Sequence, residues 1–178
     1  SRFEQVDSTN FSYAQPWHLE GQGFLWLRTQ YQQEYGSRHL YWLRSDDGLS
    51  WSEPQKLIAI EQGNYQISWS DGEKVATAFD MHPEPYGPYT EVEGYMGLNW
   101  RSNLYYLETR DGGRTWLTVT GDTVQPPVTE RDHVSLAYNS LADDQRVYLK
   151  DLAFDAQGRP VILFLRSQGY RPGPENGP

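Results

Sequence analysis

The chain has 178 residues, which is enough for one ordinary domain and too few for two. Acidic residues outnumber basic ones by 24 to 15, and the resulting formal charge of −9 argues against binding to nucleic-acid backbones or to anionic membranes. The sequence contains no cysteine, which excludes disulfides, thiolate metal sites and a cysteine nucleophile. No apolar run approaches the roughly 18 residues of a membrane-spanning segment.

Short strands account for the pattern along the chain. Apolar residues alternate with polar ones or form short β-branched and aromatic runs, separated by 16 glycines and 11 prolines, and helical spacing is hard to find. The sequence therefore predicts an all-β fold. The expected strands, in chain order, cover residues 23–29, 38–44, 55–60, 65–70, 74–79, 103–109, 116–120, 147–154 and 160–166.

One motif occurs twice: a strand, a tight turn rich in Asp and Gly, and a Ser/Thr-Trp pair that opens the next strand. Asp46 and Asp111 lie 65 residues apart, as do Trp51 and Trp116. In such a turn the aspartate accepts backbone N–H groups, glycine takes positive φ and the hydroxyl completes the local network. We therefore predict structural roles for Asp46, Gly48, Ser50, Trp51, Thr109, Asp111, Gly113, Thr115 and Trp116.

The second copy, Thr109-x-Asp111-x-Gly113-x-Thr115-Trp116, resembles a full Asp-box, or BNR repeat, of sialidase-like β-propellers. The first is similar, with Arg44 in place of the usual leading Ser/Thr. Residues 101–109 and 148–163 resemble bacterial BNR-repeat family proteins, a group near the propeller-type polysaccharide lyases. The resemblance covers most of the chain from about residue 23 onward, and it implies four-stranded antiparallel blades with the box between the third and fourth strands.

On that basis the chain forms a single partial β-propeller of about two and a half blades. One blade is expected over residues 11–60, a second over 65–120 and a half blade over 147–166, followed by a tail over 167–178. A closed propeller needs about four to eight blades. Either the chain is a fragment of a longer polypeptide, which we favour, or several copies complete a ring, or an open stack leaves its edges exposed.

A long insertion over residues 81–100 is the first candidate for chemistry, because long loops in compact domains are often functional. His82 is a candidate proton-transfer group, with Tyr95 or Tyr86 as a second acid/base or stacking group. Arg101 is a candidate clamp for a substrate carboxylate, flanked by Trp100 and Asn103 as binding residues. The alternative is a loop in which these side chains only pack.

Two further candidates lie later in the chain. His133, in the polar insertion over residues 121–146, either meets His82 across adjacent blades or is an ordinary surface histidine. Lys150 and Asp151 interrupt an apolar strand, and the first strand of each blade lines the central channel, so one of the two is expected to face polar space. The alternative is that one of them lies at the outer surface.

Metal and cofactor motifs are absent from the sequence. The four histidines are scattered, and the sequence contains neither a zinc-binding helix motif nor a phosphate-binding glycine loop. We therefore expect neither a metal nor a cofactor.

The leading functional hypothesis is part of a carbohydrate-active propeller that acts on or binds an acidic polysaccharide, by hydrolysis or elimination. A sialidase is disfavoured because the Arg-Ile-Pro segment of that family is missing. The alternatives are a non-catalytic binding or scaffold propeller and an inactive fragment. An enzyme needs His82 and Arg101 in one cleft, so a separation beyond roughly 10 Å on opposite faces would remove its geometric basis. A glycan substrate would suit a secreted or periplasmic protein.

Overall fold

The computed structural model describes residue 5 and residues 7–32, 37–82 and 101–168. Within these residues the fold is all-β, with twelve strands and no helix, and hence no helix capable of crossing a membrane. The strands form three antiparallel sheets that follow one another along the chain. This arrangement is a partial propeller, which confirms the predicted fold class.

The first sheet has the order β1-β2-β3-β4. Its strands are β1 (Phe11–Leu19), β2 (Gly23–Tyr31), β3 (Arg38–Ser45) and β4 (Gln55–Ile58). The segment before β1 contacts this sheet through Asp7, which forms a 2.6 Å ion pair with the fully buried Arg28. The Arg28 guanidinium also lies 4.8 Å from the ring centres of Phe11 and Trp26.

The second sheet has the order β5-β6-β7-β8-β9, and β10 is paired with β7. Its strands are β5 (Gln66–Ser70), β6 (Val75–Met81), β7 (Ser102–Thr109), β8 (Trp116–Leu117), β9 (Thr123–Val124) and β10 (Leu136–Tyr138). The strand expected at 116–120 is thus only two residues long, and β10, which was not predicted, pairs with Leu104 and Tyr105 of β7.

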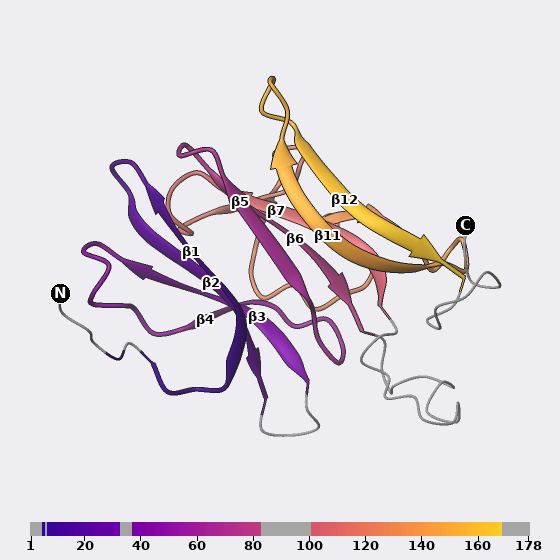
Figure 1. Ribbon diagram of the computed structural model, residues 1–178, viewed down its shortest axis with the longest axis horizontal. Coiled ribbons are helices and arrows are strands. Elements are labelled where there is room, and N and C mark those ends of the chain that lie inside the picture. Colours follow the sequence, from indigo (N-terminus) through magenta and orange to yellow (C-terminus); the bar gives the residue numbers. More distant parts are fainter. Residues whose placement is uncertain (1–4, 6, 33–36, 83–100, 169–178) are drawn as a thin grey trace.

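The third sheet is a hairpin of β11 (Arg146–Phe154) and β12 (Pro160–Ser167). Figure 1 shows the three sheets side by side, and the first strand of the second sheet, β5, contacts both β1 and β11. The first strands of the three sheets, β1, β5 and β11, therefore lie together, as the inner strands of neighbouring propeller blades do.

Two apolar clusters hold the sheets together. The larger joins the first and second sheets through fully buried side chains such as Leu25, Leu40, Phe79 and Trp116. The smaller joins the second and third sheets, with Leu152 of β11 packed among Ala76, Ala78 and Tyr106. Beside it, Lys74 of the second sheet donates to the Gly158 carbonyl in the β11–β12 turn and pairs with Glu108 at 3.2 Å.

The two Asp/Gly turns are built alike, but the first is one residue shorter. In the second turn Asp111 accepts hydrogen bonds from the Thr109 and Thr115 hydroxyls and from the backbone N–H groups of Arg114 and Thr115. This agrees with the role expected for Asp111.

In the first turn the equivalent acceptor is Asp47 and not Asp46, contrary to the sequence alignment. Asp47 accepts from the Ser45 and Ser50 hydroxyls and from the N–H groups of Leu49 and Ser50. Asp46 is exposed, and the described residues give it no hydrogen bond. Ser45, rather than Arg44, is therefore the leading residue of the motif, since its hydroxyl also accepts from the Gly48 N–H.

Candidate functional site

A pocket of about 380 Å³ opens where the inner strands of the three sheets meet. Its walls come from β1, from the start of β5, from the residue before β7 and from β11. The residues that matter for its chemistry are Tyr13, Gln15, Tyr65, Arg101, Tyr148 and Lys150. Ligand sites of propellers and other β folds favour such concave meeting points of elements.

Tyr13 reaches the pocket through an irregularity in β1. The pairing of β1 with β2 shifts register between Ser12 and Gln15, and Tyr13 there has a positive φ of 52°. A β-bulge of this kind redirects side chains, and positive φ is strained for an aromatic residue. Two contacts hold Tyr13 in this conformation. Its carbonyl accepts a 2.6 Å hydrogen bond from the Gln66 side chain, and its ring packs edge-on against the Tyr65 ring at 5.0 Å.

A similar irregularity places Lys150. The pairing of β11 with β12 shifts register between Leu149 and Asp151, so Lys150 lies at a bulge. Its Nζ atom lies 3.9 Å from the centre of the Tyr148 ring, and both residues line the pocket. Lys150 is therefore the member of the predicted Lys150-Asp151 pair that faces this space.

Arg101 is the most buried cation of the pocket wall, with 6% of its surface exposed. Its guanidinium carbon lies 3.6 Å from the centre of the Tyr65 ring and 4.2 Å from that of Tyr148. Arg38 approaches the same Tyr65 ring at 3.8 Å. Cation–π contacts of this geometry hold guanidinium groups in place while leaving N–H groups available for a ligand.

Asp80 and His82 lie behind Tyr65, at the end of β6. Asp80 is fully buried, and its Oδ1 atom accepts from the Tyr65 N–H while Oδ2 has no hydrogen-bond partner in the described structure. Burial raises the pKa of the Asp80 carboxyl to about 7, against the opposing charges of Arg101 and Arg38. Two effects act on the pKa of Arg101: burial lowers it, and the negative charge of Asp80 raises it. The net shift of the pKa is upward.

His82 is 3% exposed, and its ring lies 4.8 Å from that of Tyr65. Its Nε2 atom is 3.8 Å from Asp80 Oδ1, too far for a hydrogen bond. Burial, together with the charges of Arg101 and Arg38, lowers the pKa of His82 to about 3. The imidazole is therefore neutral at physiological pH and is a weaker base than an exposed histidine.

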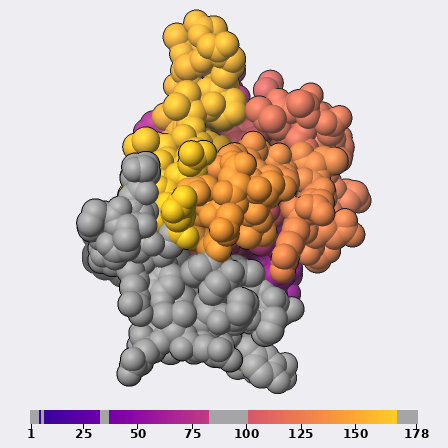
Figure 2. Space-filling view, turned by 90° about the vertical axis from the view of Figure 1, so that its right-hand side faces the viewer, coloured from indigo at the N-terminus to yellow at the C-terminus, as the bar shows by residue number. Residues whose placement is uncertain are grey.

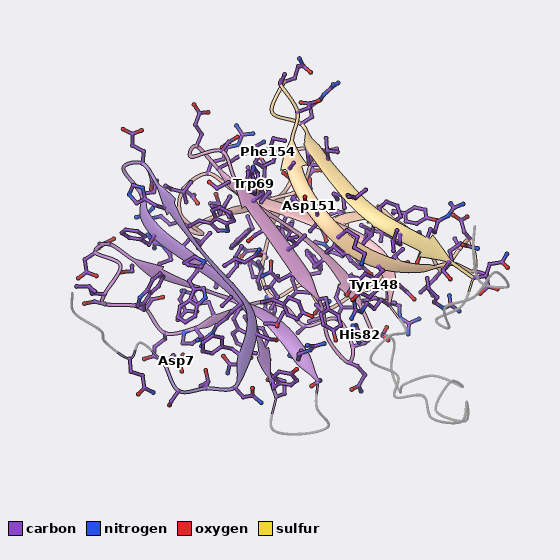
Figure 3. All side chains as sticks on the ribbon, in the orientation of Figure 1. Asp7, Trp69, His82, Tyr148, Asp151 and Phe154 are labelled. Atoms are coloured by element: carbon purple, nitrogen blue, oxygen red, sulfur yellow. The ribbon has the colours of Figure 1, made fainter. Side chains whose placement is uncertain are left out.

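His82 and Arg101 lie in one neighbourhood. Both approach the Tyr65 ring, at 4.8 and 3.6 Å, and the sum of these distances, 8.4 Å, is the largest separation that the imidazole centre and the guanidinium carbon can have. The two groups are thus closer than roughly 10 Å, but of the two only Arg101 lines the pocket. Figure 3 shows His82 and Tyr148 toward one end of the inner strands, with Trp69 and Phe154 toward the other.

The other predicted site residues in the described structure have different surroundings. Asn103 is 1% exposed and uses its amide within the fold, donating to the Tyr105 hydroxyl and accepting from the Leu141 N–H. Asp151 is exposed, its carboxylate accepts from the Leu152 N–H, and it does not line the pocket.

His133 contacts Ser135 in the loop before β10 and does not line the pocket either. The roles predicted for Tyr86, Tyr95 and Trp100 fall on residues outside the described structure. No cluster of three or more His, Asp or Glu side chains suited to a metal ion occurs in the described ranges.

Six residues of this site were missed in the sequence: Tyr13, Gln15, Tyr65, Tyr148, Arg38 and Asp80. A usable signal existed for four of them, because they lie in or beside the first strands of their sheets, the position used to single out Lys150: Tyr13, Gln15, Tyr65 and Tyr148. Arg38 and Asp80 gave no such signal, since their place depends on how the first sheet packs against the second.

Comparison with known proteins identifies the fold. The sequence matches no described protein family, and no curated protein is similar to it in sequence. Among solved structures, the chain superposes on a polysaccharide lyase of family PL25, an ulvan lyase bound to -[GlcA(1-4)Rha3S]-, with a TM-score of 0.70 and 17% identity. A second structure of PL25 ulvan lyase matches with a TM-score of 0.68 and 16% identity. Both matches cover 88% of this chain but only 37% of the lyase chain.

Proposed function

We propose that the pocket between the inner strands binds a carboxylate group of a uronate-containing polysaccharide, as part of a carbohydrate-active propeller with lyase-type chemistry. The observation that carries the proposal is the convergence of Arg101 and Lys150 with three tyrosines in a chain whose formal charge is −9. Two cations in one pocket of a negatively charged chain favour an anionic ligand, and tyrosine rings with their hydroxyls favour sugars. The likeness in fold to polysaccharide lyases supports the same ligand class.

An elimination would remove the proton next to the uronate carboxylate and expel the glycosidic oxygen on the neighbouring carbon. Arg101 and Lys150 would stabilise the charge that develops on the carboxylate, and preorganised charges of this kind are worth several kcal/mol. The Tyr148 phenol, which lines the pocket, would serve in proton transfer, whereas His82 would need to move to reach the sugar. The phenol of Tyr13 remains protonated because burial raises its pKa, so it can donate.

Binding without chemistry is the second candidate, and one observation favours it. His82 is nearly fully buried and does not line the pocket, so in this arrangement its ring does not reach the space that a sugar would fill. Tyr148, 43% exposed and in the pocket wall, is then the better-placed proton carrier of the two.

The test compares binding of a uronate oligosaccharide with binding of its carboxyl-reduced, neutral counterpart. Arg101→Gln and Lys150→Gln are each expected to weaken uronate binding by about tenfold, as for the loss of one charged hydrogen bond. They should leave the weaker binding of the neutral sugar unchanged. Arg159→Gln, which removes an exposed arginine in the β11–β12 turn, is the matched control. Equal binding of the two sugars, or variants that bind like wild type, would overturn the proposal.

Catalysis has its own measurement, the ultraviolet absorbance of the unsaturated uronate that elimination creates. A signal that disappears in Tyr148→Phe and in Arg101→Gln supports elimination. Binding without that signal, in the protein at its full natural length, leaves the non-catalytic alternative.

A further inference from the structure

A second groove, of about 690 Å³, lies between the outer strands of the first two sheets. One wall is formed by β3 and β4, and the other by the second Asp/Gly turn, β8, β9 and the segment 125–127. The order β1-β2-β3-β4 puts β4 three strand spacings from β1, or about 14 Å. The groove and the pocket are therefore separate places on the molecule.

The groove carries an unusual set of side chains. Its cations are Arg44, Lys56 and Arg114, and none of the residues that line it is an aspartate or a glutamate. The groove is therefore lined by cations alone among charged residues, in a chain whose formal charge is −9. Two tryptophans, Trp42 and Trp116, form its floor and meet edge-on at 5.7 Å.

Several polar groups in this groove are unused. Within the part of the chain that the structure describes, neither Arg44 nor Lys56 forms an ion pair with a carboxylate, although Lys56 Nζ lies 5.6 Å from the centre of the Tyr41 ring. The Nε atom of Arg44 and the indole Nε1 of Trp116 are buried and have no hydrogen-bond acceptor there, although Trp116 is only 1% exposed. By contrast, Trp42 donates to the Gly113 carbonyl at 3.1 Å. Buried donors without acceptors cost free energy unless a ligand or water satisfies them.

We propose that this groove is a second binding site, for an acidic saccharide segment distinct from the one held in the pocket. Free cationic donors select carboxylate or sulfate groups, since a guanidinium binds such groups with two N–H bonds. The flanking amides and hydroxyls, among them Gln55 and Thr115, suit sugar hydroxyls. The choice of a saccharide among anionic ligands rests on the proposed function, whereas the site itself rests on the groove.

The experiment follows two signals by NMR while a uronate tetrasaccharide is added. The indole N–H of Trp116 reports on the groove, and the ring of Tyr148 reports on the pocket. In wild type, both signals are expected to move, and the shift at Trp116 should weaken as salt is raised. The double variant Arg44→Gln/Lys56→Gln should weaken the Trp116 response about tenfold or more and leave the Tyr148 response unchanged. Arg159→Gln is again the control.

The outcomes separate this site from the pocket. A Trp116 signal that does not move, or that moves equally in the double variant, overturns the groove as a site. Loss of the Trp116 response in Arg101→Gln would also overturn it, because the two sites would not be independent. If inorganic sulfate alone gives the same affinity, or a DNA oligonucleotide binds more tightly, the saccharide is the wrong ligand. If Trp116 responds and Tyr148 does not, the pocket's function fails and the groove stands.

Discussion

Asp47 organises the first Asp/Gly turn alone, although Asp46 stands beside it. Both side chains are exposed, but four donors from Ser45, Leu49 and Ser50 bond to the Asp47 carboxylate, whereas the described residues give Asp46 no hydrogen bond. The backbone N–H groups of Ser50 and Leu49 lower the pKa of Asp47 to about 2. Asp47 therefore stabilises the fold above its unfolded pKa of about 3.9, and this contribution is lost as the pH falls towards 2.

Asp47→Ala is therefore expected to lower the melting temperature at pH 7, and Asp46→Ala to leave it unchanged. The matching change in the second turn, Asp111→Ala, removes four hydrogen bonds and should cost about 1–3 kcal/mol. Thermal unfolding of the three variants provides the measurement. A larger effect of Asp46→Ala than of Asp47→Ala would contradict the observed turn.

Asp80 provides a pH-dependent prediction. Its pKa is raised from an unfolded value of about 3.9 to about 7, so the folded state holds a proton that the unfolded state has released. The stability from this group is present below pH 4 and is lost as the pH rises towards 7. His82, whose pKa is lowered, acts in the opposite direction between about pH 3 and 6.5.

Comparison with Asp80→Asn isolates the carboxyl, because His82 remains in both proteins. Between pH 4.5 and 7.5, wild type is expected to lose stability relative to Asp80→Asn by an amount on the order of a few kcal/mol. Urea unfolding across that range measures the difference. A constant difference between the two proteins would mean that Asp80 titrates normally.

The limits of sequence reasoning are visible at single residues. The equal spacing of 65 residues made Asp46 look equivalent to Asp111, because counting back from the tryptophan cannot detect that one turn is a residue shorter. The role of Ser45 as the leading hydroxyl was hidden by the same shift. By contrast, Lys150 was singled out because the first strand of each blade lines the central channel, and Arg101 because it ends the long insertion. Both line the pocket.

At the scale of elements, the outer edge of β7 is covered in two pieces. β8 pairs with β7 at Glu108 only, the chain then leaves the sheet, and β10 returns to pair at Leu104 and Tyr105. On the way, Val128 exchanges backbone hydrogen bonds with Leu57 and Ala59 at the edge of β4. Strand prediction missed β10 because three residues give almost no alternation, and its pairing depends on distant contacts.

Asn103 holds the segment that contains β10 and the residues after it against β7, and its backbone has a positive φ of 57°. Its N–H donates to the Ser140 hydroxyl, and its side-chain oxygen accepts from the Leu141 N–H. Asn103→Ala loses the side-chain bonds and strains the backbone, so it should cost about 2 kcal/mol or more. Asn103→Gly keeps the backbone conformation and should cost less, by roughly 1 kcal/mol. Chemical unfolding ranks the two, and equal costs would exclude the backbone contribution.

At the scale of the whole molecule, the two faces of the β11–β12 hairpin differ. One face packs on the second sheet through Leu152, while Val161, Leu163 and Leu165 are 52–61% exposed on the other. Figure 2 shows this hairpin, coloured orange to yellow, at the surface of the molecule. Among the described strands, β12 pairs only with β11, and a row of exposed aliphatic residues beside such an edge favours association with another sheet.

Two leucines on this hairpin form a matched pair. Leu152→Ala should destabilise the protein by about 2–5 kcal/mol, because it leaves a cavity between the second and third sheets. Leu163→Ala should change stability by less than about 0.5 kcal/mol and reduce self-association. Unfolding and light scattering on both variants measure these effects. Comparable losses of stability would show that the outer face is covered in solution.

Gly113 sets the distance between the second turn and the first sheet. A Cβ atom there would lie 2.8 Å from Trp42 Cδ1, nearer than two carbons can approach. Any larger residue would push the second turn away from the first sheet. Because the sheets converge on their inner strands, this separation would tilt the first two sheets relative to each other about the pocket. We therefore expect the width of the pocket between the inner strands to depend on the absence of a Cβ atom at Gly113, in the outer turn.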